Sequence, residues 1–313
     1  MPLDPLVKAF LDRAAAIPRP KTWDVPPAVA RQSFAGMMQI TASKDVAVGR
    51  VENFSIPGPG GPLRARSYAP IAAVGPLPTL IYFHGGGFVA GSLESHDGLC
   101  RLFTAEGGFK VIAVDYRLAP EHPWPAAVDD AWAATQWVEQ NAASLGVDAG
   151  RIAVGGDSAG GMLAALVTHL AREKGGLKIA YQLLLFPNTQ MDGETSSMNE
   201  FAVGYFLERR AIDYFNSLYL PPGTDRSSPK VSPLRAKDFS GLPPAYVMLA
   251  GFDPLHDEGL AYAEKLKAAR VKVIVADYSD MVHGFIYFQT VLSQAHDAVA
   301  QAAKAVKTAL DAA

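Results

Sequence analysis

Short apolar runs alternate with longer amphipathic segments over most of the chain. From Thr79 onward each run is continuously apolar and is bounded by Gly, Pro or Asp, which is typical of strands covered on both faces by crossover helices. The predicted strands of this kind span residues 80–83, 111–114, 152–154, 180–186, 245–250 and 271–276. Helical periodicity falls between them, at residues 126–143, 159–173, 257–269 and 295–310. The pattern therefore predicts an α/β protein with a mostly parallel sheet flanked by helices.

The chain before Thr79 follows other patterns. Apolar residues recur at helical spacing over residues 6–15, directly after an Asp-Pro pair that favours a helix start. Two strand-like runs, at 46–56 and 63–68, flank a Pro- and Gly-rich turn at 57–62 and indicate a hairpin. We therefore expect an N-terminal helix and an antiparallel beginning to the sheet.

One connection is much longer than a crossover requires. About 58 residues separate the predicted strands at 180–186 and 245–250, where roughly a dozen would suffice. In its middle, residues 201–220 are rich in Phe, Tyr and Leu at helical spacing. Long insertions often carry binding elements, so we expect a helical cap over a substrate site. A helix packed on the surface would give the same pattern.

Composition and charge narrow the class of partner. The 313 residues include 28 Lys and Arg against 31 Asp and Glu, so the formal net charge is −3. No overall positive field is available to bind a nucleic-acid backbone or an anionic membrane, and we expect neither partner. With 49% hydrophobic and 19% charged residues, the chain has enough apolar material to fold.

Cysteine use and the N-terminal residues bear on location. The single cysteine, Cys100, can form neither an internal disulfide nor a zinc site. Residues 1–20 lack the basic and apolar regions of a signal peptide. No apolar stretch reaches the roughly 18 residues of a membrane span. We therefore expect a cytoplasmic protein with no stable membrane insertion.

The clearest chemical signal is a G-x-S-x-G motif, formed by Gly156-Asp157-Ser158-Ala159-Gly160. It lies directly after a predicted strand and at the start of a predicted helix. In this context the glycines allow a sharp turn that projects the serine Oγ in front of the helix N-terminus. A dinucleotide-binding motif would need a glycine at the position of Asp157, and a P-loop would need a lysine at the position of Gly161, so neither kind of phosphate site is indicated. Ser158 is therefore the candidate nucleophile.

A glycine run follows the predicted strand at 80–83, in the order His84-Gly85-Gly86-Gly87. Such a run lets backbone N–H groups approach a substrate oxygen and form an oxyanion hole with the N–H after the nucleophile. The candidate donors are Gly85, Gly86, Gly87 and Ala159. For an isolated glycine run, a tight turn without chemistry is the simpler alternative. We expect His84 to brace this loop rather than to transfer protons.

A serine nucleophile needs a base, and the base needs an acid that orients it. In a fold of this kind the acid and then the histidine follow the serine along the chain. His283 comes after the last predicted strand, where the carboxyl edge of the sheet would present it near Ser158. Asp253, after the strand at 245–250, is the candidate acid; the alternative, Asp257, is better placed to cap the following helix. Histidines and carboxylates show no metal-ligand spacing, and we expect no metal.

Five segments together resemble the bacterial hormone-sensitive lipase family (family IV) of α/β-hydrolase esterases. They are HGGGF at 84–88, DYRLAPE at 115–121, GDSAGG at 156–161, DPL with Asp257 at 253–257, and HGF at 283–285. The resemblance extends over essentially the whole chain from Met1, and it departs at Met162, where many relatives carry Asn. It implies a structural role for the DYRLAPE segment, whose Arg and two carboxylates would tie loops below the active site.

The resemblance also implies the fold, the domain division and the activity. The expected fold is an α/β-hydrolase, with an eight-stranded core and a cap formed by N-terminal helices and the insertion after the sixth strand. We assign residues 1–43 and 188–228 to the helical cap, and residues 44–187 and 229–313 to the catalytic core. The implied enzyme is a serine carboxylesterase that hydrolyses short- to medium-chain acyl esters through an acyl-enzyme, without a cofactor. Its partner would be a small-molecule ester, and it would be a monomer or a homodimer.

Apolar side chains near the predicted site are candidates for the substrate pocket, although the same spacing is typical of a cap core. They are Phe88, Phe201, Tyr205, Phe206, Leu207 and Phe215. Two other functions stay open. An amidase, a lactonase or a formamidase would use the same triad. The other is a non-catalytic ligand receptor on the same fold. Such receptors resemble this family but commonly lack the triad histidine, whereas His283 is present here.

Overall fold

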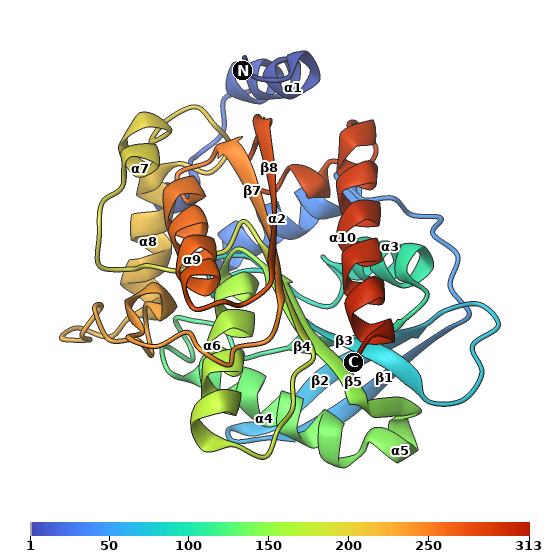
Figure 1. Ribbon diagram of the computed structural model, residues 1–313. Coiled ribbons are helices and arrows are strands. Elements are labelled where there is room, and N and C mark those ends of the chain that lie inside the picture. The colour runs from blue at the N-terminus through green and yellow to red at the C-terminus, as the bar shows by residue number, and fades with distance from the viewer. Residues whose placement is uncertain (1) are drawn as a thin grey trace.

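The computed structural model describes residues 2–313 and contains one eight-stranded sheet in the order β1-β2-β4-β3-β5-β6-β7-β8 (Figure 1). The two pairs β1/β2 and β2/β4 are antiparallel, and the remaining neighbours are parallel. The strands are β1 (Arg50–Gly58), β2 (Gly61–Ala69), β3 (Leu77–Phe83), β4 (Lys110–Asp115), β5 (Val147–Asp157), β6 (Tyr181–Leu185), β7 (Ala245–Phe252) and β8 (Val273–Val282). The predicted fold class is confirmed: a mostly parallel sheet with an antiparallel start.

Helices cover both faces of this sheet (Figure 1). Along β3, Leu80 and Tyr82 belong to one buried apolar cluster, whereas Ile81 and Phe83 belong to another, because successive side chains of a strand point to opposite faces. The first cluster includes residues of two helices, α3 (Asp97–Gly107) and α10 (Ser293–Asp311). The second includes residues of α4 (Ala126–Gln140), α6 (Ala159–Lys174) and α9 (His256–Ala268). The sheet is therefore the middle of three layers.

The strands predicted after Thr79 are confirmed, and so are the helices predicted at 159–173, 257–269 and 295–310. The helix predicted at 126–143 is instead two helices, α4 and α5 (Ala142–Leu145). One strand extends beyond its predicted end, and this extension matters for the site. The predicted strand at 271–276 is β8, which continues to Val282. The second half of β8 includes polar residues, among them Asp277 and Ser279. Polar residues are tolerated there because β8 is an edge strand, with a neighbouring strand on one side only. His283 therefore lies in the turn that directly follows the strand.

Within residues 2–313, two α-helices and one short 3-10 helix, Thr22–Asp24, precede the hairpin. In α1 (Pro5–Ala16) the side chain of Asp4 accepts hydrogen bonds from two backbone N–H groups of the first turn, as the Asp-Pro start predicts. The N–H of Asp4 also donates to the O of Asp280 in β8, which attaches α1 to the edge of the sheet. The helix α2 (Pro27–Thr41) has no clear signal in the sequence. The hairpin itself is confirmed, although β1 begins at Arg50 instead of residue 46.

The insertion after β6 contains two α-helices, α7 (Ser196–Glu200) and α8 (Arg209–Tyr219), and one short 3-10 helix, Pro233–Arg235. The prediction of one helix over 201–220 is correct only in its second half. Gly204 and Phe206 have φ of 90° and 70°, and an α-helix cannot run through this left-handed backbone. We propose that residues 1–43 and 188–228 form the cap; Met1 lies outside the described residues. In Figure 1, α7 and α8 lie beside α9, and α1 lies beyond the upper ends of β7 and β8.

Candidate active site

Ser158 occupies the turn between β5 and α6. Its φ of 54° and ψ of −115° form a conformation that residues other than glycine rarely adopt. The turn is fixed by two hydrogen bonds to the chain around the end of β6: the N–H of Ser158 donates to Leu185 O (2.8 Å), and its O accepts from Asn188 N (3.2 Å). This strained strand-to-helix turn is the geometry of a nucleophile elbow.

The glycine loop follows β3, the strand next to β5 in the sheet. Gly86 and Gly87 have φ of 115° and 62°, which glycine adopts at little energetic cost. The O of Gly86 accepts hydrogen bonds from Val89 N (3.1 Å) and Ala90 N (2.8 Å), and these close the loop into a turn. A Cβ at Gly87 would lie 2.5 Å from the ring of Phe215, so α8 packs directly on the loop.

His283 and Asp253 are in direct contact. The Nδ1 of His283 lies 2.7 Å from the Oδ2 of Asp253, and both side chains are buried. The other carboxylate oxygen, Oδ1, accepts from Leu255 N at 2.8 Å, so the loop after β7 holds the acid in place. The ring of Phe186 packs edge-on against His283, with 4.8 Å between ring centroids. Because Nδ1 faces the acid, Nε2 is the ring nitrogen that is free to exchange a proton.

The alternative acid, Asp257, has a different partner. It lies in the first turn of α9, and its Oδ2 accepts from Ser197 N at 2.9 Å. The expectation that Asp257 caps α9 is therefore wrong, because its carboxylate binds the first turn of α7. The neighbouring His256 contacts Asp257 and Asp277, and its hydrogen bond with Asp277 raises the pKa of His256 to about 9.

A buried acid, Asp157, directly precedes the candidate nucleophile, and the sequence assigns no role to it. Asp157 accepts hydrogen bonds from the hydroxyls of Tyr82 (2.5 Å) and Tyr287, and Nε2 of His96 lies 3.4 Å away. Burial alone would raise the pKa of Asp157, but His96 and the two tyrosines lower it to about 2. These partners come from three separate segments around the elbow. The available signal is the residue type, since an acid at the end of a buried strand needs partners.

His84 is the first residue after β3 and directly precedes the three glycines of the loop. Its Nδ1 is 2.8 Å from Gly85 O, and its ring stacks on Tyr116 with 4.3 Å between centroids. The hydroxyl of Tyr116 donates to the O of His84 at 2.7 Å. Burial, together with the neighbouring His96, lowers the pKa of His84 to about 3. A neutral, closely packed imidazole matches the expected bracing role.

The DYRLAPE segment is tied through its charged groups to two helices and a strand, instead of to loops as expected. Arg117 forms a two-point ion pair with the buried Asp130, with N–O distances of 2.7 and 2.9 Å. Glu121 binds Arg31 of α2, and Asp115 lies 3.4 Å from Arg64 of β2. Each charged group is engaged with a neighbouring element.

Comparisons with known proteins bear on family and enzyme class. Residues 80–287 match a protein family described as having the alpha/beta hydrolase fold. The chain belongs to this α/β-hydrolase family. The esterase LipI of Mycobacterium tuberculosis is 43% identical over 264 residues, 83% of this chain and 82% of LipI. The carboxylesterase NlhH of the same species is 44% identical over 251 residues, covering 79% of this chain and 78% of NlhH.

A solved structure is similar over nearly the whole length. It is an ester hydrolase from the metagenome of Lake Arreo, in complex with a bipyridine phosphonate derivative, with a TM-score of 0.96. It is 43% identical and covers 98% of each chain. This α/β-hydrolase is therefore an enzyme of the carboxylic ester hydrolase class. Among residues 2–313, no helix is long and apolar enough to cross a membrane.

The six residues predicted for the substrate pocket of this hydrolase are packed mainly against protein. Phe88 is buried and stacks on Tyr219, with 3.9 Å between centroids. The others contact separate groups: Phe201 and Tyr205 pack on Phe252, Phe206 on Phe288, Leu207 on the cluster of Met198, Ile212 and Leu255, and Phe215 on Gly87. Of the six, Phe215 is the one that contacts the glycine loop from the cap.

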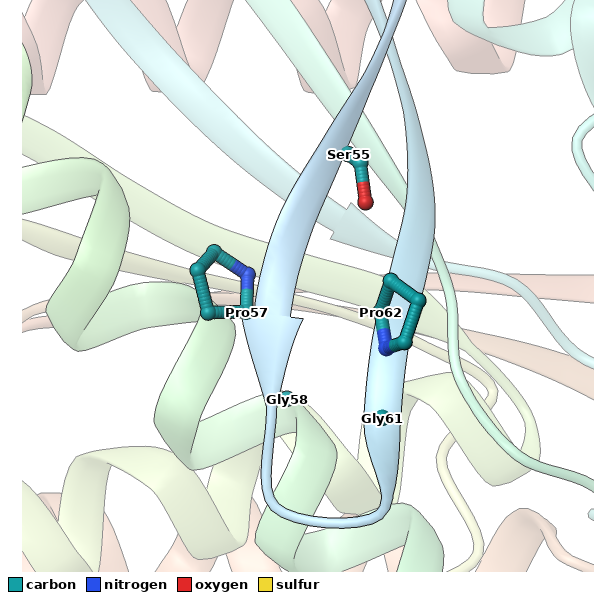
Figure 2. A pocket seen from close by; sticks show the side chains of 5 residues that line it. All are labelled: Ser55, Pro57, Gly58, Gly61 and Pro62. Carbon is teal, nitrogen blue, oxygen red and sulfur yellow. The ribbon is translucent and has the colours of Figure 1, made fainter.

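Two hollows have linings that include none of these six side chains. One of about 220 Å³ lies between the chain after β6, the cap helices and the start of α9, and its lining includes Asn188, Met198 and Leu255. The other, of about 350 Å³, lies at the tip of the β1/β2 hairpin (Figure 2). Its lining residues are Ser55, Pro57, Gly58, Gly61 and Pro62, which include no acid or base. The hairpin hollow therefore offers no catalytic pair.

Glu258 of α9 is a buried acid whose titration should make the free energy of unfolding depend on pH. Its Oε1 accepts from Thr189 N (2.6 Å) and Gln190 N (3.1 Å), yet burial raises the pKa of Glu258 to about 8. Between its ordinary value of 4.5 and about pH 8, the unfolded chain loses this proton while the folded chain keeps it. The free energy of unfolding therefore falls as pH rises through this window, by up to about 1.4 kcal/mol per pH unit.

We expect Glu258→Gln to remove this pH dependence. The amide stays neutral and keeps an oxygen to accept from Thr189 and Gln190. Urea unfolding at pH 5 and pH 8 measures the free energy of unfolding of both proteins. The variant should gain stability relative to the wild type as pH rises. An equal difference at both values would mean that Glu258 is ionised in the folded protein.

Proposed function

We propose that this protein is a serine carboxylesterase in which Ser158, His283 and Asp253 form the catalytic triad. The observation that carries the proposal is the 2.7 Å contact between buried His283 Nδ1 and Asp253 Oδ2. It lies at the carboxyl ends of β7 and β8, on the sheet edge where Ser158 occupies a strained turn after β5. In an α/β sheet, this edge is where ligands bind.

The first half of the reaction forms an acyl-enzyme. The Oγ of Ser158 attacks the ester carbonyl carbon while its proton moves to Nε2 of His283, and the carbonyl electron pair moves onto oxygen. Asp253 holds the imidazole and stabilises its charged form. When the tetrahedral intermediate collapses, the bond to the leaving oxygen breaks and His283 gives the proton to the alcohol.

Water completes the second half by the same route. His283 takes a proton from water, the hydroxide oxygen bonds to the acyl carbon, and the Ser158 ester breaks as Oγ regains the proton. The products are a carboxylic acid and an alcohol. Every proton transfer therefore uses groups of this chain or water.

The oxyanion hole is assigned to the N–H groups of Gly86, Gly87 and Ala159, with Gly85 as a further donor. Ala159 is the first residue of α6, so its N–H has no acceptor within the helix. The positive φ of Gly86 and Gly87 supports this assignment, because it turns the main chain at the end of β3. Each donor would lower the barrier by roughly 3 to 4 kcal/mol.

Hydrolysis of p-nitrophenyl esters from acetate to palmitate tests the substrate class. We expect kcat/KM to peak at short or medium acyl chains. Anilide and lactone analogues measured in parallel distinguish the amidase and lactonase alternatives, which require their substrates to be turned over faster than the matched esters. Saturable ester binding without turnover would instead favour a ligand receptor.

A further inference from the structure

Arg31 of α2 contacts the main chain next to the glycine loop. Its Nε donates to Val89 O at 2.7 Å, and its Nη2 donates to Ala119 O at 2.8 Å. The same guanidinium forms a two-point ion pair with Glu121, at 2.9 and 2.5 Å. Val89 and Ala119 are fully buried, whereas the Arg31 side chain is 28% exposed. Arg31 therefore binds interior main chain from the rim of the protein.

The carbonyls of Val89 and Ala119 flank a main-chain hydrogen bond that joins the end of the glycine loop to the segment at Ala119. The N–H of Val89 donates to Gly86 O at 3.1 Å, which closes the loop, and the N–H of Ala119 donates to Phe88 O at 2.9 Å. Arg31 joins the O of Val89 to the O of Ala119, and so connects the same two segments a second time. The helix α2 thus supplies a second bridge to the main chain that follows Gly86 and Gly87.

The ion pair with Glu121 does not by itself account for this arrangement. Glu121 is 55% exposed, and exposed ion pairs contribute little to stability. A planar guanidinium donates in several fixed directions at once, to two carbonyls and one carboxylate, whereas a lysine ammonium offers one point of charge. The contacts at this position therefore require arginine.

We propose that Arg31 is a positioning residue for the oxyanion hole, holding the main chain of residues 86–89 so that its N–H groups face the developing oxyanion. The inference rests on the proposed serine esterase function. Arg31 does not touch the substrate and acts through the loop. Donors displaced by about 1 Å can cost on the order of 100-fold in rate. Loss of Arg31 therefore lowers turnover more than it weakens substrate binding.

The test compares Arg31→Gln and Arg31→Lys with wild type on p-nitrophenyl butyrate. Two inhibitors are measured alongside: an alkyl trifluoromethyl ketone, which adds to the serine and forms an oxyanion in the hole, and the matching methyl ketone, which stays planar. For Arg31→Gln we expect kcat to fall about tenfold, KM to change less than about twofold, and trifluoromethyl ketone binding to weaken about tenfold. Methyl ketone binding stays unchanged, and Arg31→Lys is intermediate.

Glu121→Gln is the matched control, because it removes the ion pair and leaves both carbonyl contacts; its kcat should stay within about twofold of wild type. A lower Tm for Arg31→Gln with unchanged kcat and unchanged trifluoromethyl ketone binding would overturn the inference. If Arg31→Gln does not fold, Arg31→Lys decides by the same measurements. Ser158→Ala in the same assays separates the two proposals: full activity there rejects the serine esterase, whereas an inactive Ser158→Ala beside an unaffected Arg31→Gln rejects only the role of Arg31.

Discussion

Replacing Ser158 by alanine is expected to lower kcat for p-nitrophenyl butyrate by about 10⁴-fold or more, because the proposed reaction uses the Ser158 hydroxyl as its nucleophile. The fold should be retained. Alanine and serine both carry a Cβ, so the strain of a φ of 54° is nearly the same for the two residues. Steady-state rates and the near-ultraviolet circular dichroism spectrum check both parts.

Ser217 provides the control for this variant. It is exposed on α8, and its hydroxyl donates within the helix to Tyr214 O at 2.7 Å. Ser217→Ala should keep the wild-type rate. If Ser158→Ala kept more than a tenth of the activity, another nucleophile or a directly activated water would have to carry the reaction.

Gly160→Ala should damage both the fold and the site, through main-chain collisions. A Cβ on Gly160 would lie 1.9 Å from Phe83 O and 2.7 Å from His84 O, which are backbone atoms at the end of β3. To relieve them, α6 must move away from β3, and Ser158 then separates from the glycine loop. We expect a loss of about 3 kcal/mol or more in the free energy of unfolding, with a large fall in kcat. Urea unfolding and kcat of the folded fraction measure the two effects.

Gly36→Ala is the comparison for this substitution. Gly36 lies within α2, and a Cβ there would meet nothing within 4 Å. Alanine should therefore be neutral or stabilising by up to about 1 kcal/mol. Wild-type stability in Gly160→Ala would show that the contact between α6 and β3 is looser than these distances indicate.

The parts of the site that the sequence predicts best are those fixed by local backbone geometry. A sharp turn after a buried strand limits the residue types at Gly156 and Gly160, and it thereby marks Ser158 between them. His283 and Asp253 are found by order along the chain and by position at strand ends. The 2.7 Å contact between them is a fact of tertiary structure that agrees with this reasoning.

The features that escape prediction depend on partners far away in sequence. The helix α3 contains Gly98 and Gly107, which lower its intrinsic helix propensity, although its apolar side chains are buried against α10. For the predicted pocket residues, spacing indicates apolar character and says nothing about neighbours. The ring of Phe206, for example, packs against Phe288, which lies five residues after His283. Periodicity cannot supply such pairings.

The contact of Asp257 with α7 has a consequence for engineering substrate preference by exchanging caps. Ser197 N, in the proposed cap, binds the carboxylate of Asp257, four residues after the proposed catalytic acid, just as Phe215 packs on Gly87. A chimera that joins a foreign cap to this core would leave Asp257 and Gly87 without these partners. The transplantable unit is therefore the cap together with the core residues it touches, and recombination libraries should place their crossovers accordingly.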